Sequence, residues 1–211
     1  MRPLQVGILI SVLLLLVLGH LIAESGHLNK ETAWMYVAFF YTAWIIASLF
    51  VFLNTRDIKK MFSRPENKAW YLLFLPVVIA IFICIFLPNR HLIQWDHWLL
   101  MNLIICLVNP FMEEIYWRGL VSRISDAPLA SFLFSTTSFA VSHAWVLGVN
   151  SPGVAGYVGF AGSFVVGTLF WWCYYKTKSL WGCVIAHFFI DVVGMAVYIL
   201  ADKAFLAPLA V

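Results

Sequence analysis

The sequence has very few charged residues. Asp, Glu, Lys and Arg make up only 11% of its 211 residues, whereas soluble globular domains contain about 25% of them. Together with a hydrophobic content of 63% and a mean hydropathy of +0.92, this scarcity excludes a soluble globular domain and indicates an integral membrane protein. The net charge of +3 comes from scattered residues, so the chain offers no basic face for nucleic acid.

Cysteines and repeats are also scarce. The four cysteines show no CxxC or metal-type spacing, so we expect them to be buried as small apolar side chains. No internal repeat or linker divides the chain, which predicts a single integral membrane domain over residues 1–211. The N-terminal apolar run has no A-x-A cleavage pattern, and we interpret it as a first transmembrane helix.

Apolar stretches of about 20 residues, long enough to cross a hydrocarbon core of about 30 Å, recur along the chain. They predict an all-α, polytopic transmembrane helix bundle with about seven spans. Five Lys and Arg residues lie in the short segment 54–68, which places this segment, and with it the N-terminus, in the cytoplasm. The expected spans are approximately 4–23, 34–53, 69–87, 96–124, 128–147, 153–175 and 179–200.

Charged residues do occur inside the fourth expected span, where Glu113, Glu114 and Arg118 lie within six residues. A charged side chain at the bilayer centre costs roughly 2.5–3.5 kcal/mol, and such residues usually face the bundle interior and serve a function there. Glu114 and Arg118 are four residues apart, as are His187 and Asp191 in the last span. Each pair therefore shares one helix face.

The depth of these residues tests whether they can meet. If the fourth helix continues to about Ile124, a rise of 1.5 Å per residue places Glu113 and Asp191 each roughly 16 Å from the inner face. His187 then lies at roughly 10 Å and His143 at roughly 22 Å. Side-chain length and helix tilt close these gaps, whereas a shorter fourth helix would leave Glu113 and His143 at opposite faces. We therefore expect the long helix.

The motifs Glu113-Glu114-x-x-x-Arg118, Phe139-x-x-x-His143 and His187-x-x-x-Asp191 together resemble those of the CPBP intramembrane proteases, the CaaX proteases and bacteriocin-processing enzymes also called the Abi family. The resemblance covers a motif-bearing core of about residues 96–200. It implies an intramembrane endopeptidase without a cofactor, acting on membrane-anchored or lipidated proteins or peptides in the bilayer. It also suggests a multi-pass protein of the bacterial inner membrane.

The resemblance implies a role for each motif residue. Glu113 would be the general base that activates a water, His143 would hold and polarise that water, and His187 would stabilise the oxyanion. Asp191 stands where the eukaryotic branch has asparagine, and an ionised carboxylate cannot donate a hydrogen bond to an oxyanion. Either Asp191 is protonated, or it holds His187 in its donating state as the Asp of a serine protease does; we favour the second. The residues expected to support the site are Glu114, Arg118 and Phe139.

Three alternative functions stay open from the sequence. Glu113, His143 and His187 could bind zinc with a water as fourth ligand, although the chain has no HExxH motif. A proton-coupled transporter could use the same acids and histidines as a relay, although repeated halves are absent. A binding protein that kept the motifs without turnover is the third.

Overall fold

The described secondary structure is entirely helical. The computed structural model describes residues 2–25, 30–65, 67–90, 97–150 and 155–200, and within these ranges no residue lies in a strand. The prediction of an all-α protein is therefore confirmed. The expected starts of the fourth and sixth helices, at residues 96 and 153, lie outside the described residues.

Helices occupy each of the seven apolar stretches, with ends shifted by a few residues. A short additional helix, α3 (Thr55–Met61), lies in the segment expected to be a loop. The long helical stretches are α1 (Pro3–Glu24), α2 (Lys30–Phe52), a rod made of η1 (Lys68–Phe74), α4 (Leu75–Ile81), η2 (Phe82–Phe86) and α5 (Leu87–Asn89), α6 (His97–Glu114) with η4 (Ile115–Leu120) and η5 (Val121–Ile124), α7 (Pro128–Ser142) with η6 (His143–Leu147), α8 (Gly156–Thr177) and α9 (Trp181–Leu200).

Several of these helices have the length and composition of membrane spans. In the described ranges, four stretches qualify, namely Pro3–Glu24, Ala33–Phe52, Lys68–Phe86 and Gly156–Thr177, and a shorter apolar helix covers Trp181–Gly194. Apolar helices of this length indicate a protein that crosses the membrane several times. The count of seven spans and the cytoplasmic N-terminus stay predictions.

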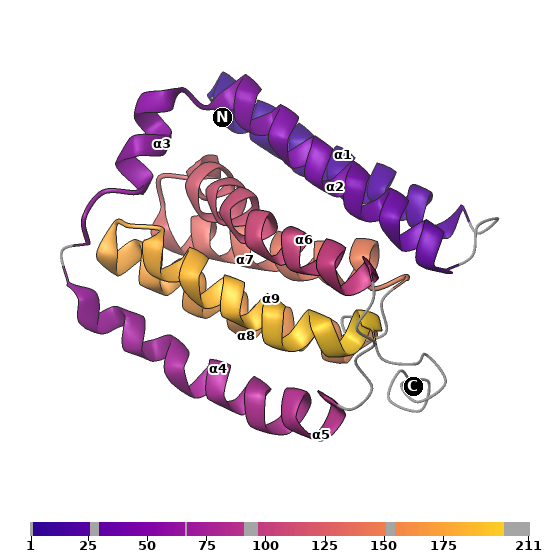
Figure 1. Cartoon of the computed structure of the whole chain (residues 1–211). Helices are drawn as coiled ribbons and strands as arrows, with labels where there is room; N and C mark the ends of the chain where they lie inside the picture. The colour runs from indigo at the N-terminus through magenta and orange to yellow at the C-terminus, as the bar shows by residue number, and fades with distance from the viewer. Residues whose placement is uncertain (1, 26–29, 66, 91–96, 151–154, 201–211) are drawn as a thin grey trace.

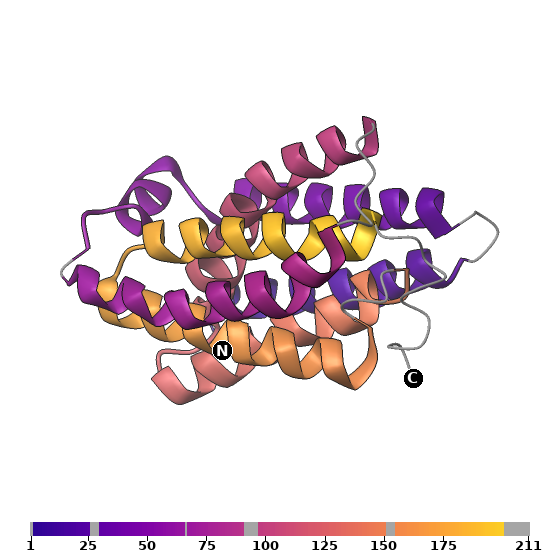
Figure 2. The ribbon, with the colours of Figure 1, turned by 60° about the horizontal axis from the view of Figure 1, so that its bottom comes forward.

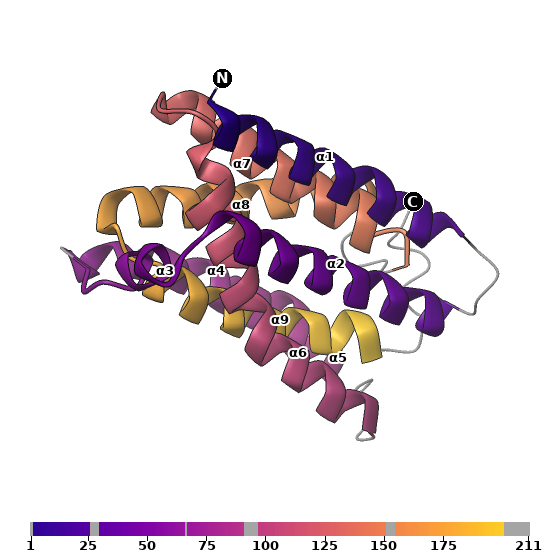
Figure 3. The ribbon, with the colours of Figure 1, turned by 90° about the horizontal axis from the view of Figure 1, so that it is seen from above.

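The helices form successive layers. In Figure 1, α1 and α2 lie side by side at one edge, α6 and α7 follow, α8 and α9 lie beyond them, and the η1–α5 rod forms the opposite edge. Figure 2 shows the rod running alongside α9. Seen from above in Figure 3, α6 and its continuation run obliquely to α1 and α2, which brings η4 beneath the N-terminal hairpin.

The fourth helical stretch continues past the acidic pair, as the depth argument requires. α6 ends at Glu114, and η4 and η5 extend the helix to Ile124. Three described turns are π-helical, namely η2 in the rod, η4, and η6, which begins at His143. Single π-helical turns are frequent at functional sites, and η4 and η6 begin at or beside residues that the motifs single out.

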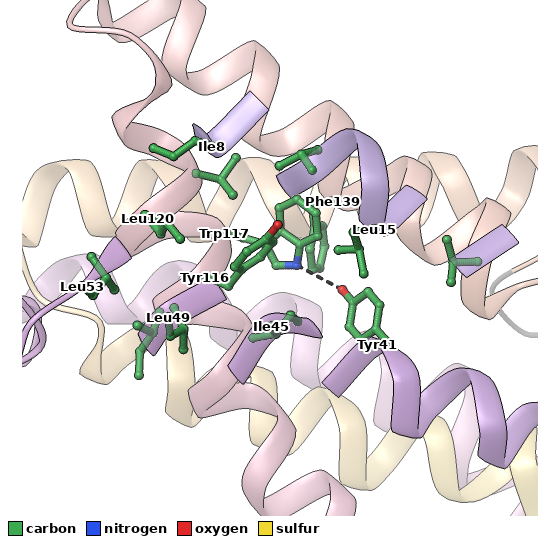
Figure 4. Close-up of a cluster of buried hydrophobic side chains, with 14 of the residues drawn as sticks. Ile8, Leu15, Tyr41, Ile45, Leu49, Leu53, Tyr116, Trp117, Leu120 and Phe139 are labelled. Atoms are coloured by element: carbon green, nitrogen blue, oxygen red, sulfur yellow. Dashed lines mark hydrogen bonds between the residues drawn. The ribbon is translucent and has the colours of Figure 1, made fainter. Parts of the chain in front are cut away.

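The largest buried apolar cluster joins η4 to the N-terminal hairpin (Figure 4). Tyr116 and Trp117 have no exposed surface and pack edge to face, with ring centroids 4.8 Å apart. Their polar atoms are paired, because Trp117 Nε1 donates to the Tyr41 hydroxyl at 3.1 Å and the Tyr116 hydroxyl lies 3.2 Å from Ser11 Oγ. The cluster thus fixes η4 against α1 and α2 without leaving these donors unsatisfied.

Candidate functional site

The two adjacent carboxylates lie at the end of α6 and are fully buried. Glu113 and Glu114 are both 0% exposed, and consecutive helical residues point about 100° apart, so each carboxylate meets different partners. Asn109, one turn earlier on α6, donates from Nδ2 to Glu113 Oε1 at 3.1 Å. This hydrogen bond orients the carboxylate and leaves its second oxygen, Oε2, to face other helices.

Two histidines approach that second oxygen from different helices. His143 begins η6 and His187 lies in α9, and the Nε2 atom of each is 3.8 Å from Glu113 Oε2. This distance is too long for a direct hydrogen bond, but one water can bridge two polar groups at such a separation. The structure therefore brings together the three side chains whose depths were expected to allow it.

The imidazole of His187 is held by carboxylates on both sides. Its Nδ1 lies 2.9 Å from Glu114 Oε1, and its Nε2 lies 3.5 Å from Asp191 Oδ1. Because a carboxylate oxygen only accepts, Nδ1 carries the hydrogen of that short bond. The orienting contact that a serine-protease Asp makes with Nδ1 is thus made here by Glu114, whereas Asp191 lies on the Nε2 side.

Arg118 is buried between two aromatic rings. Its side chain is 1% exposed, and its Nη1 lies 3.3 Å from Glu114 Oε1. Nη2 donates to the carbonyl of Gly167 on α8 at 3.3 Å, while Cζ lies 4.2 Å from the centre of the Phe139 ring and 5.0 Å from that of Phe170. Ion pair, hydrogen bond and cation–π contacts together hold the guanidinium in place.

The backbone of α8 comes close to this arginine because residue 167 has no side chain. A Cβ at Gly167 would lie 3.0 Å from Phe139 Cδ1 and 3.2 Å from Arg118 Nη2. Phe139 in turn contacts His143, with ring centroids 4.2 Å apart, and its carbonyl accepts a hydrogen bond from His143 Nδ1 at 2.9 Å. In the neutral ring, Nε2 is then the unprotonated nitrogen that faces Glu113.

A cavity of about 750 Å³ lies beside these groups. Its lining includes the polar side chains of Asn109, His143, His187 and Asp191. The rest of the wall is largely apolar and comes mainly from α4, η2, α8 and α9, including Val77, Ile81, Ile85, Val166 and Ile190. A cavity with apolar walls and a few convergent polar groups is the usual form of a small-molecule or chain-binding site.

One of the comparisons with known proteins found a match. Residues 95–193 match the family model described as type II CAAX prenyl endopeptidase Rce1-like. The predicted resemblance to the CaaX proteases is confirmed over this segment. The comparisons with curated proteins and with solved structures each found no match. The matched segment begins just before α6 and ends within α9, so it contains all three motifs and leaves α1, α2 and the η1–α5 rod outside.

The structure adds residues to the candidate site that the motifs did not indicate. Asn109 precedes Glu113 by one helical turn, and this spacing was the only available signal for its contact. Gly167 and Phe170 gave no signal, since their role depends on how α8 packs against Arg118. Among the described residues, no group of three or more His, Cys, Asp or Glu side chains is arranged to hold a metal ion.

Proposed function

We propose that this protein is an intramembrane endopeptidase of the CaaX protease type in which Glu113 activates the attacking water. One observation carries the proposal: Glu113 Oε2 lies 3.8 Å from the Nε2 atoms of both His143 and His187, and these two histidines line a largely apolar cavity. The match to a family of endopeptidases supports peptide hydrolysis rather than transport or binding alone.

In the proposed reaction, one water binds between Glu113 Oε2 and His143 Nε2. His143 Nδ1 donates to the Phe139 carbonyl, so Nε2 accepts one hydrogen of the water while Glu113 accepts the other. As Glu113 takes its proton, the water oxygen bonds to the peptide carbonyl carbon and the carbonyl oxygen becomes an oxyanion. Glu113 then returns the proton to the amine as the carbon–nitrogen bond breaks.

His187 is the proposed oxyanion donor. Its Nδ1 already donates to Glu114, so a donating Nε2 requires the imidazolium form. Glu114 and Asp191 supply the negative charge beside that ring, at 2.9 Å and 3.5 Å. Preorganised donors of this kind are worth about 10²–10³ in rate. In this scheme Glu114 orients His187, and Asp191 supports its charge.

The proposed substrate is a membrane-anchored or lipidated protein or peptide. A largely apolar cavity with a few polar groups in its lining suits a lipid chain beside a peptide bond, because the chain remains out of water while the bond reaches the polar groups. The family description names prenyl endopeptidases, which agrees with this substrate class. The bacterial inner membrane stays the expected location, and cell fractionation would test it.

The experiment compares Glu113→Gln with wild type in proteoliposomes that contain lipidated peptides, with products identified by mass spectrometry. Loss of the general base is expected to lower kcat by about 10²–10⁴-fold, whereas Glu24→Gln, at the exposed end of α1, should cleave as wild type does. Cleavage by Glu113→Gln at the wild-type rate would refute the proposal.

A chelator arm tests the expectation that no cofactor is needed. Under the proposed mechanism, cleavage continues in the presence of a strong zinc chelator. The zinc alternative uses Glu113, His143 and His187 as ligands, and it predicts loss of cleavage that added Zn²⁺ restores.

A further inference from the structure

A chain of hydrogen bonds runs from the buried core to the Nδ1 side of the His143 imidazole. Trp117 Nε1 donates to the Tyr41 hydroxyl at 3.1 Å, the bond drawn in Figure 4. The Tyr41 hydroxyl lies 3.3 Å from Ser142 Oγ. Ser142 Oγ donates to the Phe139 carbonyl at 2.8 Å and lies 3.4 Å from His143 Nδ1. The chain therefore starts at η4, passes through α2 and ends at the imidazole.

The direction of every bond in this chain follows from its first donor. The indole of Trp117 can only donate, so the Tyr41 oxygen accepts there, and because the Ser142 hydrogen is used elsewhere, the Tyr41 hydrogen points to Ser142. The Ser142 hydrogen is directed to the Phe139 carbonyl, which leaves Ser142 Oγ as an acceptor towards His143. A hydrogen on Nδ1 satisfies both of these oxygens, whereas an unprotonated Nδ1 would face two acceptors.

Burial keeps this order from being disturbed by water. Trp117 and Ser142 are 0% exposed and Tyr41 is 2% exposed. In such surroundings, hydrogen bonds polarise one another and an unpaired group is costly, so the members of the chain act together. Tyr116, next to Trp117, offers a contrast, because its hydroxyl contacts Ser11 on α1 and does not lead to His143.

We propose that Tyr41 is a positioning residue for His143, holding the imidazole with its hydrogen on Nδ1 through the Ser142 hydroxyl so that Nε2 faces Glu113. The inference rests on the proposed function, in which that Nε2 binds the attacking water. Tyr41 lies on α2, outside the segment 95–193 that matches the family. The N-terminal hairpin thus contributes to the site as well as to the fold.

The test compares Tyr41→Phe with Tyr116→Phe, since each removes one buried hydroxyl from the same cluster. The first measurement is the ¹⁵N spectrum of histidine-labelled protein, in which a ring nitrogen with a hydrogen is distinct from one without it; the His143 signals are assigned by their loss in His143→Gln. Wild type and Tyr116→Phe should show the hydrogen on Nδ1, and Tyr41→Phe should show a second population with the hydrogen on Nε2.

The second measurement is cleavage of lipidated peptide. Loss of one neutral hydrogen bond corresponds to a roughly three- to tenfold change, so Tyr41→Phe should lower kcat by this factor at unchanged KM while Tyr116→Phe retains the wild-type kcat. Ser142→Ala removes the next link in the chain. If Tyr41→Phe fails to fold, Ser142→Ala should show the same second population, with the hydrogen on Nε2. An unchanged tautomer in the folded variants would overturn the inference, and this readout stands even if no peptide is cleaved.

Discussion

Replacing Arg118 with methionine should destabilise the fold strongly, because the guanidinium is buried and paired. The substitution removes the ion pair with Glu114 and the hydrogen bond to the Gly167 carbonyl, both at 3.3 Å. Breaking a buried pair on one side costs about 3–5 kcal/mol. Since Glu114 keeps its hydrogen bond with His187, we expect the lower end, about 3 kcal/mol. At about 2–4 °C per kcal/mol for a chain of this size, the Tm should fall by about 6–12 °C.

Thermal unfolding in detergent, followed by circular dichroism, measures this fall. Asp57→Asn is the matched control, because Asp57 forms an ion pair with Arg123 at 3.5 Å in which the side chains are 27% and 34% exposed. A pair that stays partly in contact with solvent contributes about 1 kcal/mol or less, so the control should lower Tm by no more than about 4 °C.

A double variant separates the ion pair from the rest of the environment of Arg118. Glu114→Gln combined with Arg118→Met removes both charges, so it should be more stable than the sum of the single effects by about 0.5–3 kcal/mol. Additive effects, or a Tm for Arg118→Met within the range of the control, would refute the reasoning that a buried charge pair anchors this part of the site.

Two further predictions concern the walls of the site. Asn109→Leu leaves Glu113 Oε1 without its hydrogen-bond donor. A hydrogen bond to a charged group is worth about 1.5–3 kcal/mol, so kcat/KM for lipidated peptide should fall roughly 10- to 100-fold. A wild-type value of kcat/KM would show that the amide does not orient the base. Gly162→Leu adds a side chain where no atom lies within 4 Å of a Cβ, on the cavity wall, so KM should rise while Tm stays unchanged. Gly167→Ala is the matching variant, since a Cβ there meets Phe139 and Arg118, and it should lower Tm. An equal Tm for the two glycine variants would contradict the packing described.

Much of the fold followed from the lengths of the apolar runs. A run of about 20 apolar residues forms a helix in a bilayer because only a helix satisfies its own backbone there. The pairs at four-residue spacing also followed: Glu114 and Arg118 lie 3.3 Å apart, and His187 and Asp191 lie 3.5 Å apart. Helix geometry alone places such side chains together.

The partners across helices could not be predicted, because they depend on how each helix is rotated about its axis. The sequence gives no sign that Glu114 rather than Asp191 contacts Nδ1 of His187. It also does not show that η4 and η6 are π-helical turns, in which an additional residue per turn changes the direction of every later side chain. The contact between Gly167 and Arg118 depends on both the rotation and the approach of α8.

The distribution of packing explains why one helical stretch contributes apolar side chains to the cavity wall. The stretch Lys68–Phe86 is only 6% buried, against 28–33% for the other three candidate spans, yet Val77, Ile81 and Ile85 from it form the apolar wall of the cavity. A wall that only excludes water needs no fixed side-chain geometry. Groups that transfer a proton must be held within about 0.5 Å of their working positions by locked neighbours. The carboxylates and His143 therefore lie where α6, η4 and η6 are fixed by the N-terminal hairpin and by α8, whereas the described lining residues of the loosely packed rod are all apolar.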